Sequence, residues 1–507
     1  MKKKIIINGR IKFIEPDLTQ SAAIVIEDGI IRSIKKPNAL IYSHYEDVEI
    51  IDAKGAIVMP GFIDAHNHFT LMGLQIAELN LAGIVNKSTV LEKIRERHQS
   101  IDPDRVLSAF NYEYDYFDAY NRISAEDLTS VAPNRMIKIT DRSGHMSVTN
   151  AYSLERAGLR LTESENYGKD ENATFNGELY GHTNCFLSEI FRKNMRNPTV
   201  LKLAWKHAAD IAVSHGITQV HAIIPEEEMG ELIGYDECLP VNLRIYGESK
   251  NVIGAKMLGL KQIGGCGKVM IDGDTGPFTA AFLEPYTVRP DTKGLLYYTD
   301  EELNEYVWEA HYEGMQIALH CVGDAASEQF LNAVEAAQKR LPKKMRHRIE
   351  HLEFPTAEQI IRAKQLGVAI SIQPAFNYYW PHDFYITDLG EERAQRADPI
   401  RSLIDAGLLV GFGSDCTVTP CDPLLTVHAA VSHSRPQERI TVKQALYAHT
   451  AGGAKIGNED GIRGSITPGK TADLVFLAED PEEVPIAEVK DIPVLRTIVC
   501  GETVYLA

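Results

Sequence analysis

The sequence predicts an α/β fold: a (β/α)8 TIM barrel, a small β-sandwich domain built from both termini, and an insertion after the first barrel strand. Three observations predict it: β-rich segments at both chain ends, alternating apolar strands and helical stretches between them, and one interval too long for a single β/α unit. The 507 residues, 44% of them hydrophobic, suffice for a barrel with attached domains.

The two ends of the chain have the same β-strand character. Short apolar segments near the N-terminus are separated by turn dipeptides such as Asp28-Gly29, which favour two-residue hairpin turns. The segment after residue 470 repeats this pattern of short apolar runs and turns. We therefore assign residues 1–57 and 465–507 to one composite β-sandwich domain.

Residues 58–464 have the alternation of a parallel barrel. A capping-box pattern at Thr299 and Glu302 marks one of the helices between the strands. Eight β/α units predict a TIM barrel whose chemistry lies at the C-terminal ends of its strands. The eight strand candidates are residues 61–66, 217–222, 243–247, 268–273, 317–322, 348–353, 368–374 and 408–414.

An insertion separates the first two barrel strands. About 150 residues lie between them, far more than one crossover helix requires, and they contain strand-like apolar runs of their own. We assign residues 75–205 to an insertion domain at the barrel mouth. Its aromatic cluster, residues 111–117, either lines a pocket or packs the insertion, and packing is the preferred interpretation.

Composition excludes several classes of protein. The formal net charge of −18 argues against binding to nucleic acid or to anionic membranes, which needs a basic surface. Only three apolar residues follow the N-terminal lysines, and no run reaches the ~20 apolar residues of a membrane span. Seven cysteines without a CxxC pair predict free thiols in the cytoplasm. Because twofold dimers are the commonest assemblies, a homodimer is the default expectation.

Two histidines near the end of the first strand give the strongest local signal for chemistry. His66 and His68 are two residues apart, so in a strand their side chains point to the same side, which is the interior of a barrel. Imidazole is the commonest metal-binding side chain. A single HxH pair is nevertheless a weak signal by itself.

Three more polar residues stand at the tips of other predicted strands. His320, His351 and Asp415 each end an apolar run, where an unpaired buried charge is costly. Each alone is best explained as a hydrogen-bonded core residue, but the five residues together can converge on one metal centre. Lys268 begins the fourth strand candidate, and by itself it is best explained as a surface lysine.

These segments together resemble the amidohydrolase superfamily, and within it amidohydrolase family 3, which includes N-substituted formamide deformylases. The resemblance extends over nearly the whole chain, in the order of the family. The matching segments are residues 59–68, 268–273, 319–324, 349–353, 413–415 and 468–474.

The resemblance implies a metal centre with two divalent ions, zinc in the first place, with iron, manganese or nickel as alternatives. It implies that Lys268 is carboxylated and that its carbamate bridges the two ions. His66 and His68 would hold the more buried ion and His320 and His351 the outer one. By position, the implied ligands are His66, His68, Lys268, His320, His351 and Asp415.

The implied activity is hydrolysis of a C–N bond other than a peptide bond, in an amide, an N-formyl group or a cyclic amide of a small molecule. A metal-activated hydroxide would attack, and Asp415 would be the catalytic residue that carries its proton to the leaving amine. Two alternatives remain open: a mononuclear deaminase of the same superfamily, which would not need Lys268, and a catalytically silent scaffold protein.

Substrate contacts are implied for three further residues. His145 lies in a Gly-His segment of the insertion, and Asp272 and Asp324 lie in the matching strand-end segments. The sequence departs from the family pattern beside both aspartates: Ala325 stands where an arginine is common, and residues 274–278 replace a small polar segment. The substrate of a known relative therefore cannot be transferred to this chain.

Overall fold

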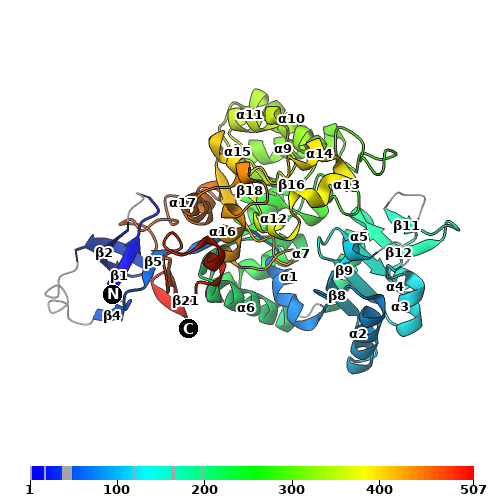
Figure 1. The fold of residues 1–507 in the computed structure, drawn as a ribbon, viewed down its shortest axis with the longest axis horizontal. Helices are drawn as coiled ribbons and strands as arrows, with labels where there is room; N and C mark the ends of the chain where they lie inside the picture. Colours follow the sequence, from blue (N-terminus) through cyan, green and yellow to red (C-terminus); the bar gives the residue numbers. More distant parts are fainter. Residues whose placement is uncertain (1–2, 16–18, 37–47, 118–120, 162–165, 196–197) are drawn as a thin grey trace.

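A computed structural model describes residues 3–15, 19–36, 48–117, 121–161, 166–195 and 198–507. Three β-sheets lie in a row (Figure 1): one built from both chain ends, a parallel barrel in the middle, and a mixed sheet on the far side of the barrel. The predicted α/β class and the eight-stranded barrel are confirmed.

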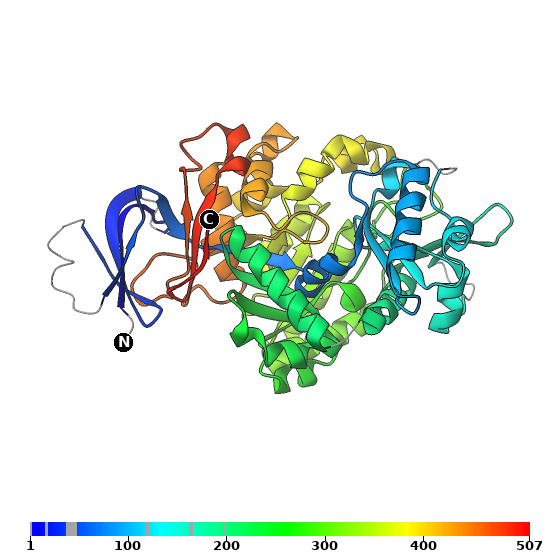
Figure 2. The ribbon, with the colours of Figure 1, turned by 90° about the horizontal axis from the view of Figure 1, so that it is seen from below.

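The first sheet joins the two ends of the chain, and Figure 2 shows the blue and red strands at the same end of the molecule. β20 pairs antiparallel with β5, which places Leu474 opposite Pro60. The turn predicted at Asp28-Gly29 is present, with φ of 50° and 78°. The strands of this sheet are β1 (Lys3–Lys12), β2 (Thr19–Glu27), β3 (Ile30–Lys35), β4 (Val48–Asp52), β5 (Ile57–Pro60), β20 (Leu474–Leu477), β21 (Val494–Val499) and β22 (Glu502–Leu506).

The barrel consists of eight parallel strands whose spatial order follows their order in the chain. A parallel bridge between Asn67 and Cys416 brings the segment after the last strand against the first strand, so the barrel is nearly closed. Seven of the eight predicted segments overlap barrel strands. The strands are β6 (Phe62–Asn67), β13 (Ile217–Pro225), β14 (Asn242–Glu248), β15 (Gln262–Gly265), β16 (Gln316–Cys321), β17 (Arg348–His351), β18 (Ala369–Ile372) and β19 (Val410–Phe412).

The prediction of the fourth strand at residues 268–273 is wrong, because the strand is β15 and residues 267–269 form a single 3-10 turn. Glycines conceal it in the sequence, since glycine is depleted in strands. Gly264 has φ of 110°, and a Cβ there would lie 2.0 Å from the carbonyl oxygen of Ala318. Only glycine allows this close approach of β15 to β16, whereas the apolar run that follows looks more strand-like.

A six-stranded sheet occupies the interval between β6 and β13. Buried apolar residues of β8, β9 and α3, among them Leu107, Ile137 and Leu128, form a core separate from that of the barrel. The loop between β9 and β10 extends from this sheet toward the barrel and carries His145. The strands are β7 (Leu79–Asn80), β8 (Leu107–Tyr112), β9 (Ile137–Asp141), β10 (Met146–Thr149), β11 (Tyr167–Lys169) and β12 (Phe175–Tyr180).

The helices cover the outside of the barrel and the insertion sheet (Figure 1). The capping box predicted at Thr299 begins α9, where Glu302 N–H donates to the Thr299 hydroxyl. Among the helices of the described ranges, none combines the length and apolar character that a membrane crossing requires. The α-helices are α1 (Phe69–Leu74), α2 (Lys87–Ser100), α3 (Ala125–Val131), α4 (Ala151–Ala157), α5 (Gly181–Met195), α6 (Pro198–Ser214), α7 (Glu226–Ile233), α8 (Val252–Met257), α9 (Asp300–Glu313), α10 (Asp324–Arg340), α11 (Ala357–Leu366), α12 (Ala375–Tyr379), α13 (Ile386–Leu389), α14 (Glu391–Ala394), α15 (Ile400–Asp405), α16 (Pro423–Val431), α17 (Val442–Tyr447) and α18 (Gly453–Ile456).

The close approach at Gly264 predicts a large effect of substitution. Gly264→Ala should lower the free energy of unfolding by about 1–2 kcal/mol for its positive φ and by a further ~1–3 kcal/mol for the contact with Ala318. Gly259→Ala is the matched control, because Gly259 has φ of 85° and a Cβ there would have nothing within 4 Å. Thermal unfolding of the two variants should separate them, and equal melting temperatures would contradict the close approach.

Candidate metal centre

Two histidines and an aspartate meet where the barrel closes. His66 ends the inward face of β6, His68 follows that strand, and Asp415 follows β19. Nε2 of each histidine lies 3.2 Å from Oδ1 of Asp415. The backbone fixes this arrangement, because the Asp415 N–H donates to the carbonyl oxygen of His66 (2.8 Å). The structure thus brings three of the predicted ligands together.

A buried carboxylate behind His66 decides which ring nitrogen faces Asp415. His66 Nδ1–H donates to Oε2 of Glu350 (2.6 Å), and Glu350 is also paired with Arg348. All three side chains are fully buried. Because Nδ1–H donates to Glu350, Nε2 is the ring nitrogen that faces Asp415, where it either carries a proton or binds a metal ion. A carboxylate in this position orients a metal-binding histidine and raises its basicity.

The charges of this group favour a cation between its members. Burial lowers the pKa of His66, but Asp415 and Glu350 outweigh this effect and raise it to about 10. Burial raises the pKa of Asp415, yet His66 and His68 hold it well below its usual range. The Asp415 carboxylate is therefore ionised, and a positive charge beside it, from a proton or a metal ion, stabilises the group.

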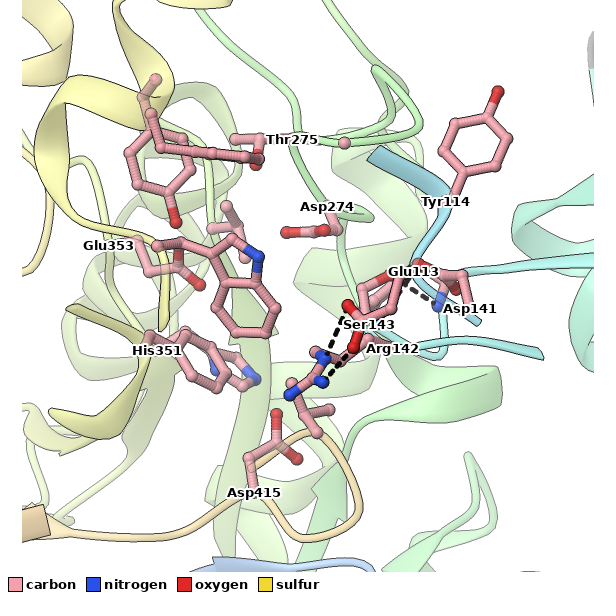
Figure 3. A pocket seen from close by; sticks show the side chains of 18 of the residues that line it. Glu113, Tyr114, Asp141, Arg142, Ser143, Asp274, Thr275, His351, Glu353 and Asp415 are labelled. Carbon is pink, nitrogen blue, oxygen red and sulfur yellow. Dashed lines mark hydrogen bonds and ion pairs between the residues drawn. The ribbon is translucent and has the colours of Figure 1, made fainter. Parts of the chain in front are cut away.

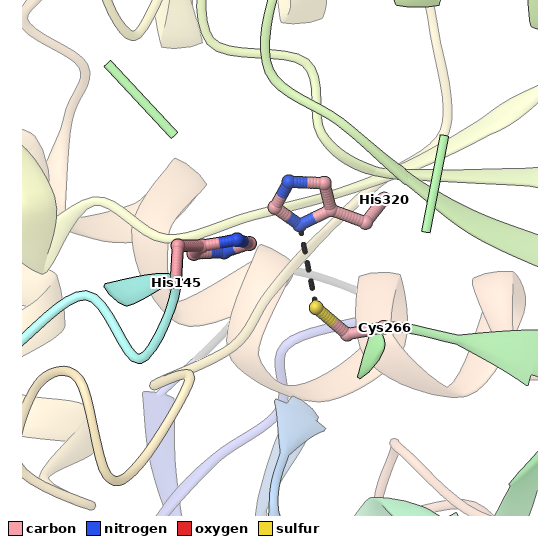
Figure 4. A group of neighbouring side chains, drawn as sticks. All are labelled: His145, Cys266 and His320. Carbon is pink, nitrogen blue, oxygen red and sulfur yellow. Dashed lines mark hydrogen bonds between the residues drawn. The ribbon is translucent and has the colours of Figure 1, made fainter. Parts of the chain in front are cut away.

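A second group of ligand-type side chains lies at neighbouring strand ends. His145, Cys266 and His320 each offer one ligand atom, and these atoms lie within 4.8 Å of one another (Figure 4). Cys266 follows β15 and His320 stands on β16, with 3.4 Å between Sγ and Nδ1. His320 Nε2–H donates to the carbonyl oxygen of Gly273 (3.1 Å), so Nδ1 is the unprotonated nitrogen.

His351, at the end of β17, lies between the two groups. Its ring centroid is 4.4 Å from that of His320 and 4.9 Å from that of His66. Burial lowers the pKa of His351 to about 3, so the ring is neutral. Within the described chain both of its ring nitrogens are buried without a hydrogen-bond partner, an arrangement that costs free energy.

The donor atoms fit a divalent metal. Nε2 of His66 and Oδ1 of Asp415 are, like the His351 nitrogens, buried without a hydrogen-bond partner among the described residues. With metal–nitrogen and metal–oxygen bonds of about 2.0–2.1 Å, a tetrahedral ion separates two ligand atoms by about 3.3–3.4 Å. The 3.2 Å distances from Asp415 to His66 and His68 agree with this spacing.

Two cavities meet at these residues. The first, about 650 Å³, has an aromatic wall interspersed with charged side chains, and in Figure 3 His351, Glu353, Asp274 and Asp415 surround it. The second, about 1140 Å³, is lined by both charged and apolar side chains. His145 and Asp415 line both. The aromatic residues of the first cavity are Tyr112, Tyr114, Tyr116, Phe376, Trp380, Phe384 and Tyr385.

A model of the amidohydrolase family matches residues 49–505, which is most of the chain. The chain belongs to the amidohydrolase family. It is 27% identical to the protein of Bacillus subtilis named as amidohydrolase YtcJ, over 97% of each chain. It is 23% identical to N-substituted formamide deformylase of Arthrobacter pascens, over 100% of this chain and 98% of that one.

A solved structure has the same fold. An uncharacterized metal-dependent hydrolase from Pyrococcus furiosus is 25% identical, with a TM-score of 0.76, over 95% of this chain and 100% of that one. The chain therefore belongs to a family of metal-dependent hydrolases, and the two ligand groups form a candidate metal centre at its barrel mouth.

Lys268 of this amidohydrolase lies outside both ligand groups of the described residues, although the resemblance implies that it bridges the two ions. Its Nζ lies 2.6 Å from Oε2 of Glu189 in α5 and 3.9 Å from Glu227, and its side chain is 36% exposed. It lines the larger cavity, but in the 3-10 turn after β15 rather than in the strand itself. The turn changes the direction of the chain, because Gly267 has φ of 64°.

Asp272 and Asp324, which were expected to contact substrate, hydrogen-bond to neighbouring segments of the chain. The Asp272 carboxylate accepts hydrogen bonds from the N–H groups of Ala281, Val322 and Gly323, at 2.8 to 3.0 Å. Asp324 accepts from the N–H of Leu283 and from Arg396. The two carboxylates hold the loops around β16, and the residues that line the two cavities include neither. His145, in contrast, lines both cavities and belongs to the second ligand group.

Sequence reasoning missed Cys266 and Glu350. Cys266 lies beside concealed strand β15, so it has no strand-end signal in the sequence. Glu350 directly precedes His351, and an acidic residue beside a strand-end histidine was the available signal. The aromatic cluster at residues 111–117 satisfies both interpretations, because Tyr112 and Tyr114 are buried in the insertion core and also line the first cavity.

The contact behind His66 predicts an effect on metal affinity. Glu350→Gln should weaken metal binding by roughly 10- to 100-fold, because the neutral amide oxygen accepts the Nδ1–H bond more weakly and no longer supports the basicity of the ring. Chelator competition measures this affinity. Asp480→Asn is the matched control, since Asp480 is a buried partner of Lys12 (3.0 Å) in the terminal sheet. Unchanged affinity in the Glu350 variant would contradict its role.

Proposed function

We propose that this chain hydrolyses a C–N bond other than a peptide bond in a small molecule, at a centre of two divalent metal ions. Amide, N-formyl and cyclic amide bonds are the expected targets. The single observation that carries the proposal is the approach of His66 and His68 to the carboxylate of Asp415 at the barrel mouth. The name of the deformylase relative supports the same bond class.

The residues of the site have separate tasks. His66, His68 and Asp415 would hold a divalent metal, which would supply Lewis-acid activation of water and of the scissile carbonyl. Asp415 is ionised and borders both cavities, so it accepts a proton from the attacking water and returns it to the leaving nitrogen. Burial lowers the pKa of His145 to about 4, so at neutral pH it is a neutral imidazole that borders both cavities.

The two cavities suggest where the two parts of the substrate bind. The aromatic wall of the smaller cavity suits an apolar or aromatic substituent, which binds there by burying its surface. The larger cavity contains Lys138, Arg192 and Glu248, and it suits a polar part of the molecule. A scissile bond beside Asp415 would then lie at the junction, with its two halves in different surroundings.

We also propose that the enzyme works in the cytoplasm. All seven cysteines of the chain are free in the structure, as is usual in a reducing compartment. The second ligand group includes a free thiol, Cys266, which an oxidising compartment would tend to oxidise.

The proposed activity predicts the result of a substrate screen. Protein stripped of metal with a chelator should hydrolyse no member of a panel of N-formyl and N-acyl amines, N-acyl amino acids and cyclic amides. Reloading with zinc, manganese, iron or nickel should restore release of the amine from at least one class. Metal-loaded protein that cleaves none of them, or protein purified without chelators that contains no metal, would support the silent scaffold instead.

The role of Asp415 predicts the effect of a conservative substitution. Asp415→Asn should lower kcat by about 10²–10⁴-fold, since a neutral amide accepts no proton, while metal stays bound to the histidines. Asp422→Asn is the control: Asp422 lies seven residues further on and caps α16, a task that asparagine performs equally well. Kinetics and elemental analysis of both variants test this, and full activity of the Asp415 variant would refute the assignment.

A further inference from the structure

The second ligand group contains a thiol that the resemblance does not assign. Cys266 is 7% exposed, directly follows β15, and lines the larger cavity together with His68 and Asp415. β15 and β16 pair in parallel, with Gly265 opposite Leu319, so the next residues along the chain, Cys266 just after β15 and His320 in β16, stand at the same level of the barrel.

The hydrogen bond of His320 leaves its other ring nitrogen facing the Cys266 thiol. Because Nε2–H donates to the carbonyl oxygen of Gly273, the lone pair of the ring is on Nδ1, which is the atom 3.4 Å from Cys266 Sγ. Metal-binding histidines commonly donate their other N–H to a backbone carbonyl in this way. His66 has the equivalent arrangement in the first group, with a carboxylate as the acceptor.

The distance between sulfur and nitrogen agrees with a shared ion. Zinc–sulfur bonds are about 2.3 Å and zinc–nitrogen bonds about 2.0–2.1 Å, so a tetrahedral ion separates its sulfur and nitrogen ligands by about 3.6 Å. The measured separation is 3.4 Å, and His145 brings a third donor within 4.8 Å of both atoms.

We propose that Cys266 is a thiolate ligand of the second metal ion, together with His320 and His145, in the position for which the resemblance implies a carboxylated Lys268. Lys268 follows two residues later, beyond the turn at Gly267, and its ammonium is held by Glu189. Carboxylation would give up that ion pair. A thiolate also favours zinc or cobalt over magnesium or manganese. The inference rests on the metal centre of the proposed function but not on its substrate.

Spectroscopy of metal-loaded protein tests this directly. X-ray absorption at the zinc edge of the full-length holoenzyme should show a sulfur neighbour at about 2.3 Å. Cobalt-substituted protein should show a thiolate-to-cobalt charge-transfer band in the near ultraviolet. Both signals should vanish in Cys266→Ser, and chelator competition should show at least a roughly tenfold weaker second ion.

Two control variants make the result specific. Cys185→Ser removes another free thiol that lines the same cavity, and it should keep both signals. Lys268→Met should also keep them and should bind two ions without bicarbonate. Because the zinc-edge measurement on the unmodified protein needs no variant, the proposal remains testable even if Cys266→Ser does not fold.

Three outcomes would overturn the proposal. The first two are the absence of a sulfur neighbour in the unmodified zinc protein and signals that persist in Cys266→Ser. The third is loss of the second ion in Lys268→Met, together with a bicarbonate requirement for loading the second ion into the unmodified protein. The last would establish the lysine carbamate instead. Failure of the proposed function is distinguishable, because a sulfur-ligated protein that cleaves no amide would keep the metal assignment and lose the reaction.

Discussion

Closure of the barrel between its first and last strands is the constraint on which the metal centre depends. Two backbone hydrogen bonds join these strands, from Asp415 N–H to the carbonyl of His66 (2.8 Å) and from His68 N–H to the carbonyl of Cys416 (2.9 Å). Below them the buried Asp64 carboxylate accepts from the Ser414 N–H and hydroxyl. The residues that close the barrel are thus also the residues that present the ligands, so opening it would separate the donor atoms.

The second ligand group depends on contacts between the barrel and the insertion sheet. His145 belongs to the insertion, whereas Cys266 and His320 belong to the barrel, and its ring lies 4.8 Å from that of His320. The same loop carries Arg142, which pairs with Glu113 and lies over the rings of Tyr379 and Trp380 from the barrel. The insertion therefore supplies both a ligand-type residue and part of the aromatic wall.

The barrel was predictable from the sequence because short apolar strands with polar ends, alternating with helical stretches, are patterns that can be recognised locally. His66, His68 and Asp415 were predictable for the same reason, since strand ends of a parallel barrel meet at one face. The glycines of β15 hid the fourth strand, and with it the position of Cys266. The directions of Asp272 and Lys268 depend on loop backbones and on Glu189 in a distant helix, which no local pattern encodes.

Crystals of metal-loaded protein, measured at the absorption edge of the bound metal, test the central claim most directly. The account predicts an anomalous peak between Nε2 of His66, Nε2 of His68 and the carboxylate of Asp415, and a second peak beside Sγ of Cys266 and Nδ1 of His320. A barrel mouth without anomalous density in crystals grown with excess metal, or density bound only by residues outside these groups, would contradict it.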